Sequence, residues 1–166
     1  SWNVSPEEAS AIQLNLREKV KIQTLPNDIH LVCGTSLYHD PNTKMVHAAL
    51  VVLRYPDMEL IESHGLSEEN TFPYVRGLLA FREAPSIMQL MKRIQHQPNV
   101  ILFNSHGLAH PRKFGLASHL GILFNIPSIG IADRILVGDH DSLHSEKGSY
   151  VPLIDNEEEV GFVLRT

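Results

Sequence analysis

The succession of short apolar runs in this chain constrains its fold more than any other feature of the sequence. Three runs rich in β-branched residues follow one another at residues 29–38, 46–55 and 58–62. The segments between them, 40–43 and 56–57, contain proline, asparagine and aspartate and are turn-like. Because such short connections join antiparallel neighbours, the pattern predicts a three-stranded antiparallel meander.

A second pattern begins after residue 73. Short buried strands are predicted at residues 100–103 and 128–132, with a helix from about 112 to 124 between them. A strand–helix–strand unit of this kind implies a parallel, right-handed crossover. Together with the meander, it predicts a mixed α/β sheet with helices packed on it.

Two further helices and a final pair of strands are also predicted. Ser5-Pro6-Glu7-Glu8 has the form of a capping box and begins a helix that should end near Gln23. Pro85 should open another helix, because apolar residues from Ile87 to Ile94 share one helical face. The stretch 150–164 should form two strands around a turn at residues 156–157.

Composition limits the class of protein. The chain has 166 residues, which predicts one domain spanning 1–166 on a prior of roughly 150 residues per domain. The single cysteine excludes a disulfide framework, and no apolar run approaches the roughly 20 residues of a membrane-spanning helix. We therefore expect no membrane partner and a cytoplasmic location, or a nuclear one in a eukaryote. The net charge of −5 argues against non-specific coating of nucleic acid but permits a local basic patch.

Polar residues follow the predicted strand 100–103. Asn104 and His106 leave its carboxyl end, and His110 and Arg112 lead into the next helix. Ligands of open α/β sheets gather beyond the carboxyl ends of parallel strands, so these side chains should lie close together. The alternative is a polar loop whose side chains only cap the ends of the strand and the helix.

The chain contains several long motifs: the stretch 73–83 reads PYVRGLLAFRE, and the stretch 107–121 reads GLAHPRKFGLASHLG. They resemble motifs of the endonuclease V family, nucleases directed at deoxyinosine. Residues 128–132 and 148–166 are similar to two further blocks of the family. The resemblance implies a ribonuclease-H-like α/β fold of the endonuclease V type, a mixed sheet flanked by helices, which agrees with the pattern of strands and helices.

The resemblance also implies a chemistry and a partner. Members of the family cut a phosphodiester bond near deoxyinosine in DNA or inosine in RNA, using magnesium held by carboxylates. Carboxylates supply the hard oxygen ligands and the charge that magnesium needs. The bound metal then activates water and stabilises the leaving oxygen. The implied partner is DNA or RNA that is structured or contains inosine.

The expected carboxylates are missing at key positions. The family's first-strand aspartate falls on Ser36, its second aspartate falls on Asn104, and a family lysine falls on Asp133. Of the family's usual metal-binding positions only Glu83 remains, with His110 and Arg112 beside it. Neutral serine and asparagine oxygens cannot replace two negative charges, so Glu83 alone should hold magnesium weakly or not at all.

Two functional hypotheses of different classes follow. In the first, the chain is a homologue that has lost cleavage, needs no cofactor and keeps a nucleic-acid-binding or interaction scaffold. In the second, it is an active endonuclease that binds magnesium or manganese at a rebuilt site, with Asp133, Asp40, His39 and His106 as replacement groups. A histidine block of the family would follow residue 166, so a trimmed form of a longer active enzyme also competes.

A nucleic-acid surface is predicted around the first motif. Tyr74 matches the family's wedge tyrosine, and the alternative is an ordinary half-buried loop aromatic. Nearby cations predict a phosphate-binding surface, and the alternative is that they are scattered surface charges with no common ligand. These cations are Arg76, Arg82, Arg112, Lys113 and Arg134. Glu83 has a structural alternative too, as a carboxylate accepting hydrogen bonds near the start of the helix opened by Pro85.

Overall fold

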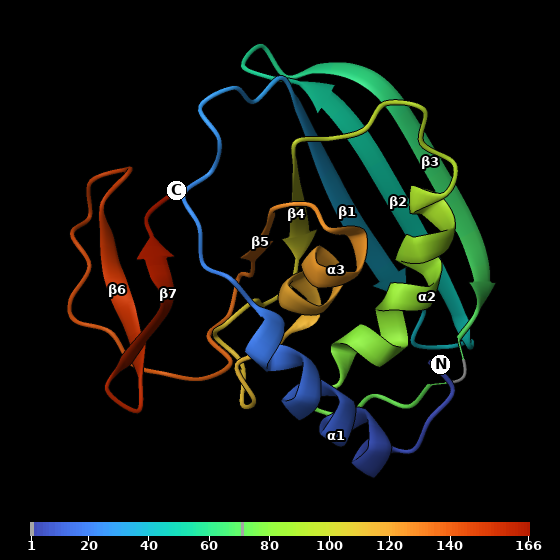
Figure 1. The fold of residues 1–166 in the computed structure, drawn as a ribbon, viewed down its shortest axis with the longest axis horizontal. Coiled ribbons are helices and arrows are strands. Elements are labelled where there is room, and N and C mark those ends of the chain that lie inside the picture. Colours follow the sequence, from blue (N-terminus) through green and yellow to red (C-terminus); the bar gives the residue numbers. More distant parts are fainter. Residues whose placement is uncertain (1, 71) are drawn as a thin grey trace.

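The centre of the protein is a five-stranded mixed sheet with the strand order β3-β2-β1-β4-β5 (Figure 1). The computed structural model describes residues 2–70 and 72–166. The strands are β1 (Leu31–His39), β2 (Met45–Arg54), β3 (Glu59–Glu69), β4 (Val100–Asn104) and β5 (Ser128–Ile131). The first three pair antiparallel, whereas β4 pairs parallel to β1 and β5 parallel to β4. The predicted meander and parallel crossover are therefore confirmed.

The third strand is longer than predicted. It continues to Glu69 instead of ending at Glu62. Its second half alternates half-buried and exposed residues, because β3 lies at the edge of the sheet and only one of its faces is covered. Such a polar alternating segment carries a weaker sequence signal than a continuous apolar run.

Three α-helices and a 3₁₀ turn complete the main body: α1 (Pro6–Leu16), η1 (Arg17–Lys19), α2 (Leu79–Met91) and α3 (Leu116–Phe124). The predicted capping box of α1 is confirmed, since the backbone N–H groups and side chains of Ser5 and Glu8 bond reciprocally. The helix ends at Leu16 and not near Gln23, because Val20 takes up extended backbone. Within the described residues, no helix combines the length and the apolar character needed to cross a membrane.

Two predicted helix starts are wrong. Pro85 lies inside α2, which already begins at Leu79. Proline in a helix interior removes one backbone hydrogen bond, but the buried face of α2 packs against the sheet and overrides that cost. The helix expected from about residue 112 begins at Leu116, because Lys113 has a φ of 53° and Gly115 is extended.

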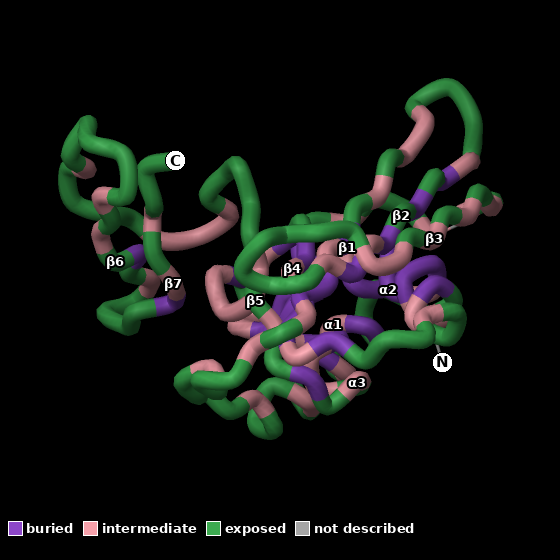
Figure 2. Tube along the Cα trace, turned by 90° about the horizontal axis from the view of Figure 1, so that it is seen from above, coloured by how far each residue is buried: buried purple, intermediate pink, exposed green. Residues whose placement is uncertain are grey.

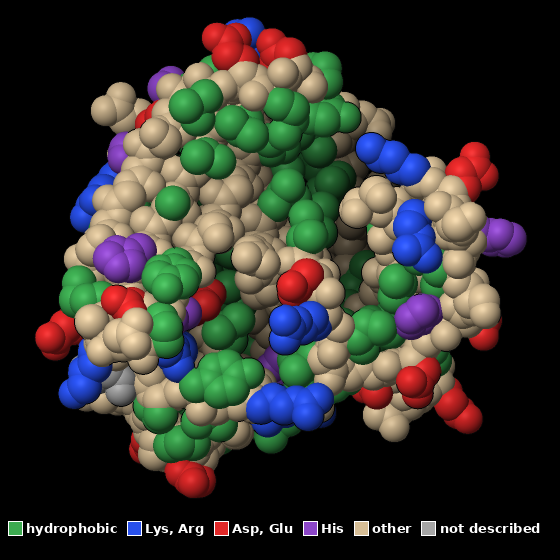
Figure 3. Space-filling model, turned by 180° about the vertical axis from the view of Figure 1, so that it is seen from behind, with side chains coloured by type: hydrophobic (Ala, Val, Ile, Leu, Met, Phe, Trp, Pro, Cys, Tyr) green, Lys and Arg blue, Asp and Glu red, His purple; other side chains and the backbone are tan. Residues whose placement is uncertain are grey.

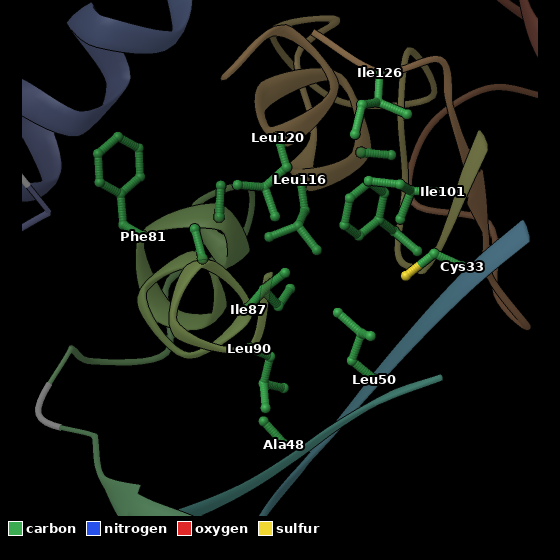
Figure 4. Close-up of a cluster of buried hydrophobic side chains, with 14 of the residues drawn as sticks. Cys33, Ala48, Leu50, Phe81, Ile87, Leu90, Ile101, Leu116, Leu120 and Ile126 are labelled. Atoms are coloured by element: carbon green, nitrogen blue, oxygen red, sulfur yellow. The ribbon is translucent and has the colours of Figure 1, made fainter. Parts of the chain in front are cut away.

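The main core lies between the sheet and the helices. Figure 4 shows Leu50 and Ile101 of the sheet facing Ile87 and Leu90 of α2 and Leu120 of α3. The tube coloured by burial shows the same buried layer between the strands and helices of the main body (Figure 2). Burial of each such side chain contributes about 1.5–3 kcal/mol, so this layer fixes how the helices lie on the sheet.

The opposite face of the sheet is partly open. Ile129 and Ile131 of β5 are 39% and 54% exposed. Seen from behind, hydrophobic side chains gather over this face and beside a hollow next to the C-terminal hairpin (Figure 3). Ser36 of β1 and Asn104 of β4 are exposed on this side of the sheet.

The predicted C-terminal strands form a hairpin of their own, β6 (Tyr150–Asp155) and β7 (Glu158–Leu164). The turn between them has φ values of 49° at Asn156 and 66° at Glu157, as a two-residue hairpin turn requires. The hairpin stands beside the β5 end of the sheet (Figure 1). An ion pair between Lys113 and Glu158 connects it to the main body.

His119 is an acid-sensitive element of the core. Its ring lies 5.0 Å from those of Trp2 and Phe114, and burial lowers its pKa to about 4. The unfolded imidazole titrates near pH 6.5, so the unfolded state binds more protons and stability falls as the pH drops from about 6.5 to 4. At pH 5 the free energy of unfolding should be lower by about 2 kcal/mol from this histidine alone.

Urea denaturation at pH 7 and pH 5 measures this effect. His119→Leu should remove its share of the pH dependence, whereas His140→Gln, at an exposed position, should leave the pH dependence unchanged. Equal pH dependence in the wild type and His119→Leu would contradict the assignment.

Candidate functional site

Ser36, within β1, and Asn104, the last residue of β4, lie side by side on neighbouring parallel strands. The residues before them, Thr35 and Phe103, pair in the parallel ladder, so Ser36 and Asn104 project from the same face of the sheet. Both are exposed and, with Ile131, line a cavity of about 390 Å³. The structure therefore brings together the two positions at which the family resemblance places aspartates.

Glu83 is held by a hydrogen-bonded chain on α2 and β1. Nε of Arg82 donates to Nδ1 of His39 at 3.2 Å, so the proton of the imidazole is on Nε2. That Nε2 donates to Oε1 of Glu83 at 2.9 Å. Glu83 is only 7% exposed and lies within α2, so its expected place near the start of a helix opened by Pro85 is wrong. Its carboxylate is committed to His39.

The side chains considered as replacement metal ligands do not converge. Asp133 is 90% exposed, and its carboxylate lies 3.9 Å from Nε of Arg134. His106 donates from Nε2 to the carbonyl oxygen of Arg134 at 2.8 Å. Oδ1 of Asp40 accepts the backbone N–H of Asn42 at 2.8 Å, within its own turn.

The donors present do not fit a catalytic magnesium ion. Within residues 2–70 and 72–166, no group of three or more His, Cys, Asp or Glu side chains is arranged to hold a metal. Ser36 and Asn104 offer neutral oxygens, and the carboxylate of Glu83 already accepts a hydrogen bond from His39. A doubly charged, strongly hydrated cation needs anionic ligands to offset its dehydration.

The carbonyl oxygen of Gly77 is the centre of a second, buried network. It accepts hydrogen bonds from Nε2 of Gln13 at 2.9 Å, Nε2 of His110 at 2.8 Å and Nη2 of Arg112 at 2.8 Å. Nε of Arg112 also donates to Oε1 of Gln13. Gly77 has a φ of 82°, and a Cβ there would meet the Arg112 guanidinium at 2.7 Å. Only glycine fits this position.

His110 is a neutral structural group in this arrangement. It is 3% exposed, and burial lowers its pKa to about 4. Nε2 donates to Gly77, so Nδ1 is free of its proton and accepts the backbone N–H of Arg112 at 3.1 Å. Both nitrogens are occupied, which leaves His110 without a lone pair for a metal.

Tyr74 is free to meet a ligand. The residue is 74% exposed, so the alternative of a half-buried loop aromatic does not describe it. The guanidinium carbon of Arg82 lies 5.9 Å from the centre of the ring. An exposed aromatic face beside a cation suits stacking on a nucleic-acid base.

The other cations predicted for phosphate binding already have partners. Nη2 of Arg76 donates to the carbonyl oxygen of Leu136 at 2.6 Å and ties the Tyr74 loop to the segment after β5. Arg112 is bonded to Gln13 and Gly77, and burial lowers its pKa from the usual value. Lys113 is paired with Glu158. Arg82 is bonded to His39 through Nε only and lies 5.9 Å from the centre of the Tyr74 ring, so its guanidinium is the one best placed for a phosphate beside Tyr74.

Sequence reasoning missed two residues of these networks. Gln13 lies on α1 and is completely buried, although glutamine is normally a surface residue of helices. Its position among the apolar residues Ile12 and Leu16 carried no signal of a partner near residue 77. His39 was considered only as a replacement metal ligand, whereas its partners are Glu83 and Arg82.

Comparisons with known proteins agree with this architecture. A family model described as Endonuclease V matches residues 14–166. Endonuclease V of Rippkaea orientalis is 42% identical over 162 residues, which are 98% of this chain and 71% of that protein. Endonuclease V of Nostoc punctiforme is 42% identical over 167 residues, 100% of this chain and 76% of that protein.

Solved structures show the same likeness. Endonuclease V of Streptomyces avermitilis has a TM-score of 0.89 and 37% identity, over 99% of this chain and 73% of that one. Ciona intestinalis endonuclease V, in complex with a 23mer DNA containing an inosine followed by a ribo-adenosine, has a TM-score of 0.73 and 28% identity. This second match covers 81% of this chain and 61% of that one. The predicted α/β fold of the endonuclease V type is thereby confirmed.

The Gly77 network makes a prediction about His110. His110→Ala should lower the free energy of unfolding by about 2–4 kcal/mol, because it leaves a cavity, removes a donor to the buried carbonyl of Gly77 and leaves the partly buried backbone N–H of Arg112 without its acceptor. Amide exchange of Leu78, whose N–H bonds to Val75, should accelerate as the loop loosens. Urea denaturation and hydrogen exchange measure the two effects. His140→Ala, at an exposed position, is the control, and an unaltered Leu78 amide would contradict the proposed restraint.

Proposed function

Since the chain belongs to the endonuclease V family, we propose that it binds nucleic acid on the family's surface and has lost metal-dependent phosphodiester cleavage. The observation that carries the proposal is the neutral pair Ser36 and Asn104. They stand together where the resemblance places two aspartates, so the site has two negative charges fewer than the family pattern requires. Without them, the dehydration of a magnesium ion has no adequate compensation.

The state of Glu83 supports the same proposal. The one carboxylate left at the family's metal positions accepts a hydrogen bond from His39, which in turn accepts one from Arg82. Freeing Glu83 for a metal would break this buried chain. A hydrogen bond to a charged group contributes about 1.5–3 kcal/mol, a cost that the metal would have to offset.

Binding of nucleic acid is supported by Tyr74 and by one relative. The exposed ring of Tyr74 and the guanidinium of Arg82 offer stacking and phosphate contact at one place. The Ciona intestinalis relative is described in complex with inosine-containing DNA, and we extend that partner class to this chain. We propose inosine-containing DNA or RNA as the ligand, with binding that depends strongly on phosphate contacts.

The first test is cleavage. In magnesium or manganese, the protein should not cut a DNA or RNA oligonucleotide that contains inosine, because the site lacks the charge that would hold the metal. Gel analysis of end-labelled strands measures this. Cutting by the unmodified protein that Glu83→Gln abolishes would overturn the proposal and establish an active, rebuilt enzyme.

Restoring the charge tests the cause. The double variant Ser36→Asp, Asn104→Asp should bind manganese at least about tenfold more tightly than the wild type, since two carboxylates then face one cation at close range. Electron paramagnetic resonance of free manganese measures the affinity. Ser36→Asn is the neutral control and should leave the affinity unchanged. Equal binding by the double variant and the wild type would contradict the charge argument.

Tyr74 tests the binding half of the proposal. Tyr74→Ala should weaken binding of an inosine-containing strand by about 1–3 kcal/mol, the usual contribution of base–aromatic stacking. Fluorescence anisotropy measures the affinity, and the free energy of unfolding should change little because the residue is 74% exposed. Tyr150→Ala, another exposed tyrosine, on β6, is the control. Equal affinity of the wild type for inosine-containing and unmodified strands would remove the case for inosine recognition.

A further inference from the structure

A small cavity opens beside the loop that carries Tyr74. Its volume is about 250 Å³, smaller than the pockets that enclose drug-sized ligands. It therefore suits a single chemical group better than a whole nucleoside. The lining residues come from the β1–β2 connection, from the segment after β3 and from α2: His39, Asp40, Thr43, Lys44, Met45, Asn70, Phe72, Pro73 and Arg82.

Two cations of the cavity have no carboxylate partner. In the described part of the chain, no carboxylate of an aspartate or glutamate lies within ion-pair distance of Lys44 or Arg82. Asp40 also lines the cavity, but its carboxylate is turned into its own connection. The backbone N–H of Asn42 and the hydroxyl of Thr43 lower the pKa of Asp40 and hold it in that turn. The cavity thus presents the ammonium group of Lys44 and the guanidinium of Arg82, of which only Nε is engaged, by His39.

Asn70 holds the parts of the cavity together. Its backbone N–H donates to the carbonyl oxygen of Lys44 at 2.7 Å, and its side-chain amide donates to the carbonyl oxygen of Arg82. Its Oδ1 accepts the backbone N–H of Phe72 at 3.0 Å. One residue therefore anchors the backbone at Lys44, at Arg82 and at Phe72 before Tyr74. Such preorganisation lowers the ordering cost of binding an anion.

The cavity adjoins the base-stacking position. Phe72 and Pro73 form part of its wall and directly precede Tyr74 in the chain. The Arg82 guanidinium, which His39 fixes through Nε, lies 5.9 Å from the centre of the Tyr74 ring. A phosphate bonded to the remaining nitrogens of Arg82 would belong to the nucleotide stacked on Tyr74 or to its neighbour.

We propose that this cavity is a phosphate subsite for the backbone of a nucleic-acid strand, with Lys44 and Arg82 as the binding groups and Asn70 and His39 as positioning residues. The proposal deepens the proposed function and rests on it, because the phosphodiester would come from the strand whose base stacks on Tyr74. DNA and RNA share this chemistry.

Inorganic phosphate tests the subsite without a strand. In a ¹⁵N NMR titration, the Nε–H signal of Arg82 should shift and saturate, and Lys44→Gln should raise the dissociation constant at least about threefold. Lys92→Gln, beyond the opposite end of α2, should leave it unchanged. No saturable shift at Arg82, or an equal effect of the two substitutions, would overturn the subsite.

Oligonucleotides then connect the subsite to the proposed function. For single strands, each phosphate contact makes the affinity fall by a further factor of about 2.5 when the salt concentration rises from 50 to 200 mM. The fall should be smaller by this factor in Lys44→Gln, which loses one contact. In Lys92→Gln it should be the same as in the wild type. Matched DNA and RNA strands show which backbone uses the subsite. If Lys44→Gln binds the strand with the same salt dependence as the wild type, the phosphate subsite is overturned and the proposed function is not. No strand binding by the wild type overturns the proposed function, and the phosphate titration then decides whether the cavity binds anions.

Discussion

The carbonyl oxygen of Gly77 joins three segments that are far apart in the sequence. Gln13 reaches it from α1, and His110 and Arg112 reach it from the connection between β4 and α3. A buried carbonyl without partners would cost several kilocalories per mole in an apolar interior, and here it is satisfied by three donors. The loop that exposes Tyr74 leads into this glycine just before α2, so its position depends on the same contact.

This contact gives side chains of the family motifs a structural role. Two motifs resemble sequences of a nuclease, at residues 73–83 and 107–121. In this structure, however, His110 and Arg112 donate hydrogen bonds to a backbone carbonyl, that of Gly77. Arg76 and Lys113 likewise bond to Leu136 and Glu158. These side chains hold loops in place around Tyr74 and Arg82.

The sequence predicted those parts of the structure that follow from local patterns. Capping by Ser5 and the turn at Asn156 depend on residues that are neighbours in the chain, and the meander and the crossover follow from the order of local strand, turn and helix patterns. Tertiary packing decided the rest. The buried face of α2 carries the helix through Pro85, against the local preference of proline. Pairs such as His39 with Glu83 are 44 positions apart, and no spacing rule connects them.

Family resemblance added the positions of the candidate site but not its present state. It placed Ser36 and Asn104 in one site, and the parallel register of β1 and β4 makes them neighbours. It gave no sign that Glu83 would be engaged by His39, because hydrogen-bond partners across α2 and β1 depend on side-chain directions. It also left the cavity around Lys44 unmarked, since that cavity is assembled from three separate segments.

The exposure of Ser36 and Asn104 has a consequence for evolution. Substitutions at exposed positions usually change the free energy of unfolding by less than about 0.5 kcal/mol, whereas two adjacent aspartates would repel each other. Exchange of charged for neutral residues at these two positions is therefore nearly neutral, or even favourable, for folding. A protein with this scaffold can therefore gain or lose the charges of the site through a few codon changes, and each substituted form along the way stays folded.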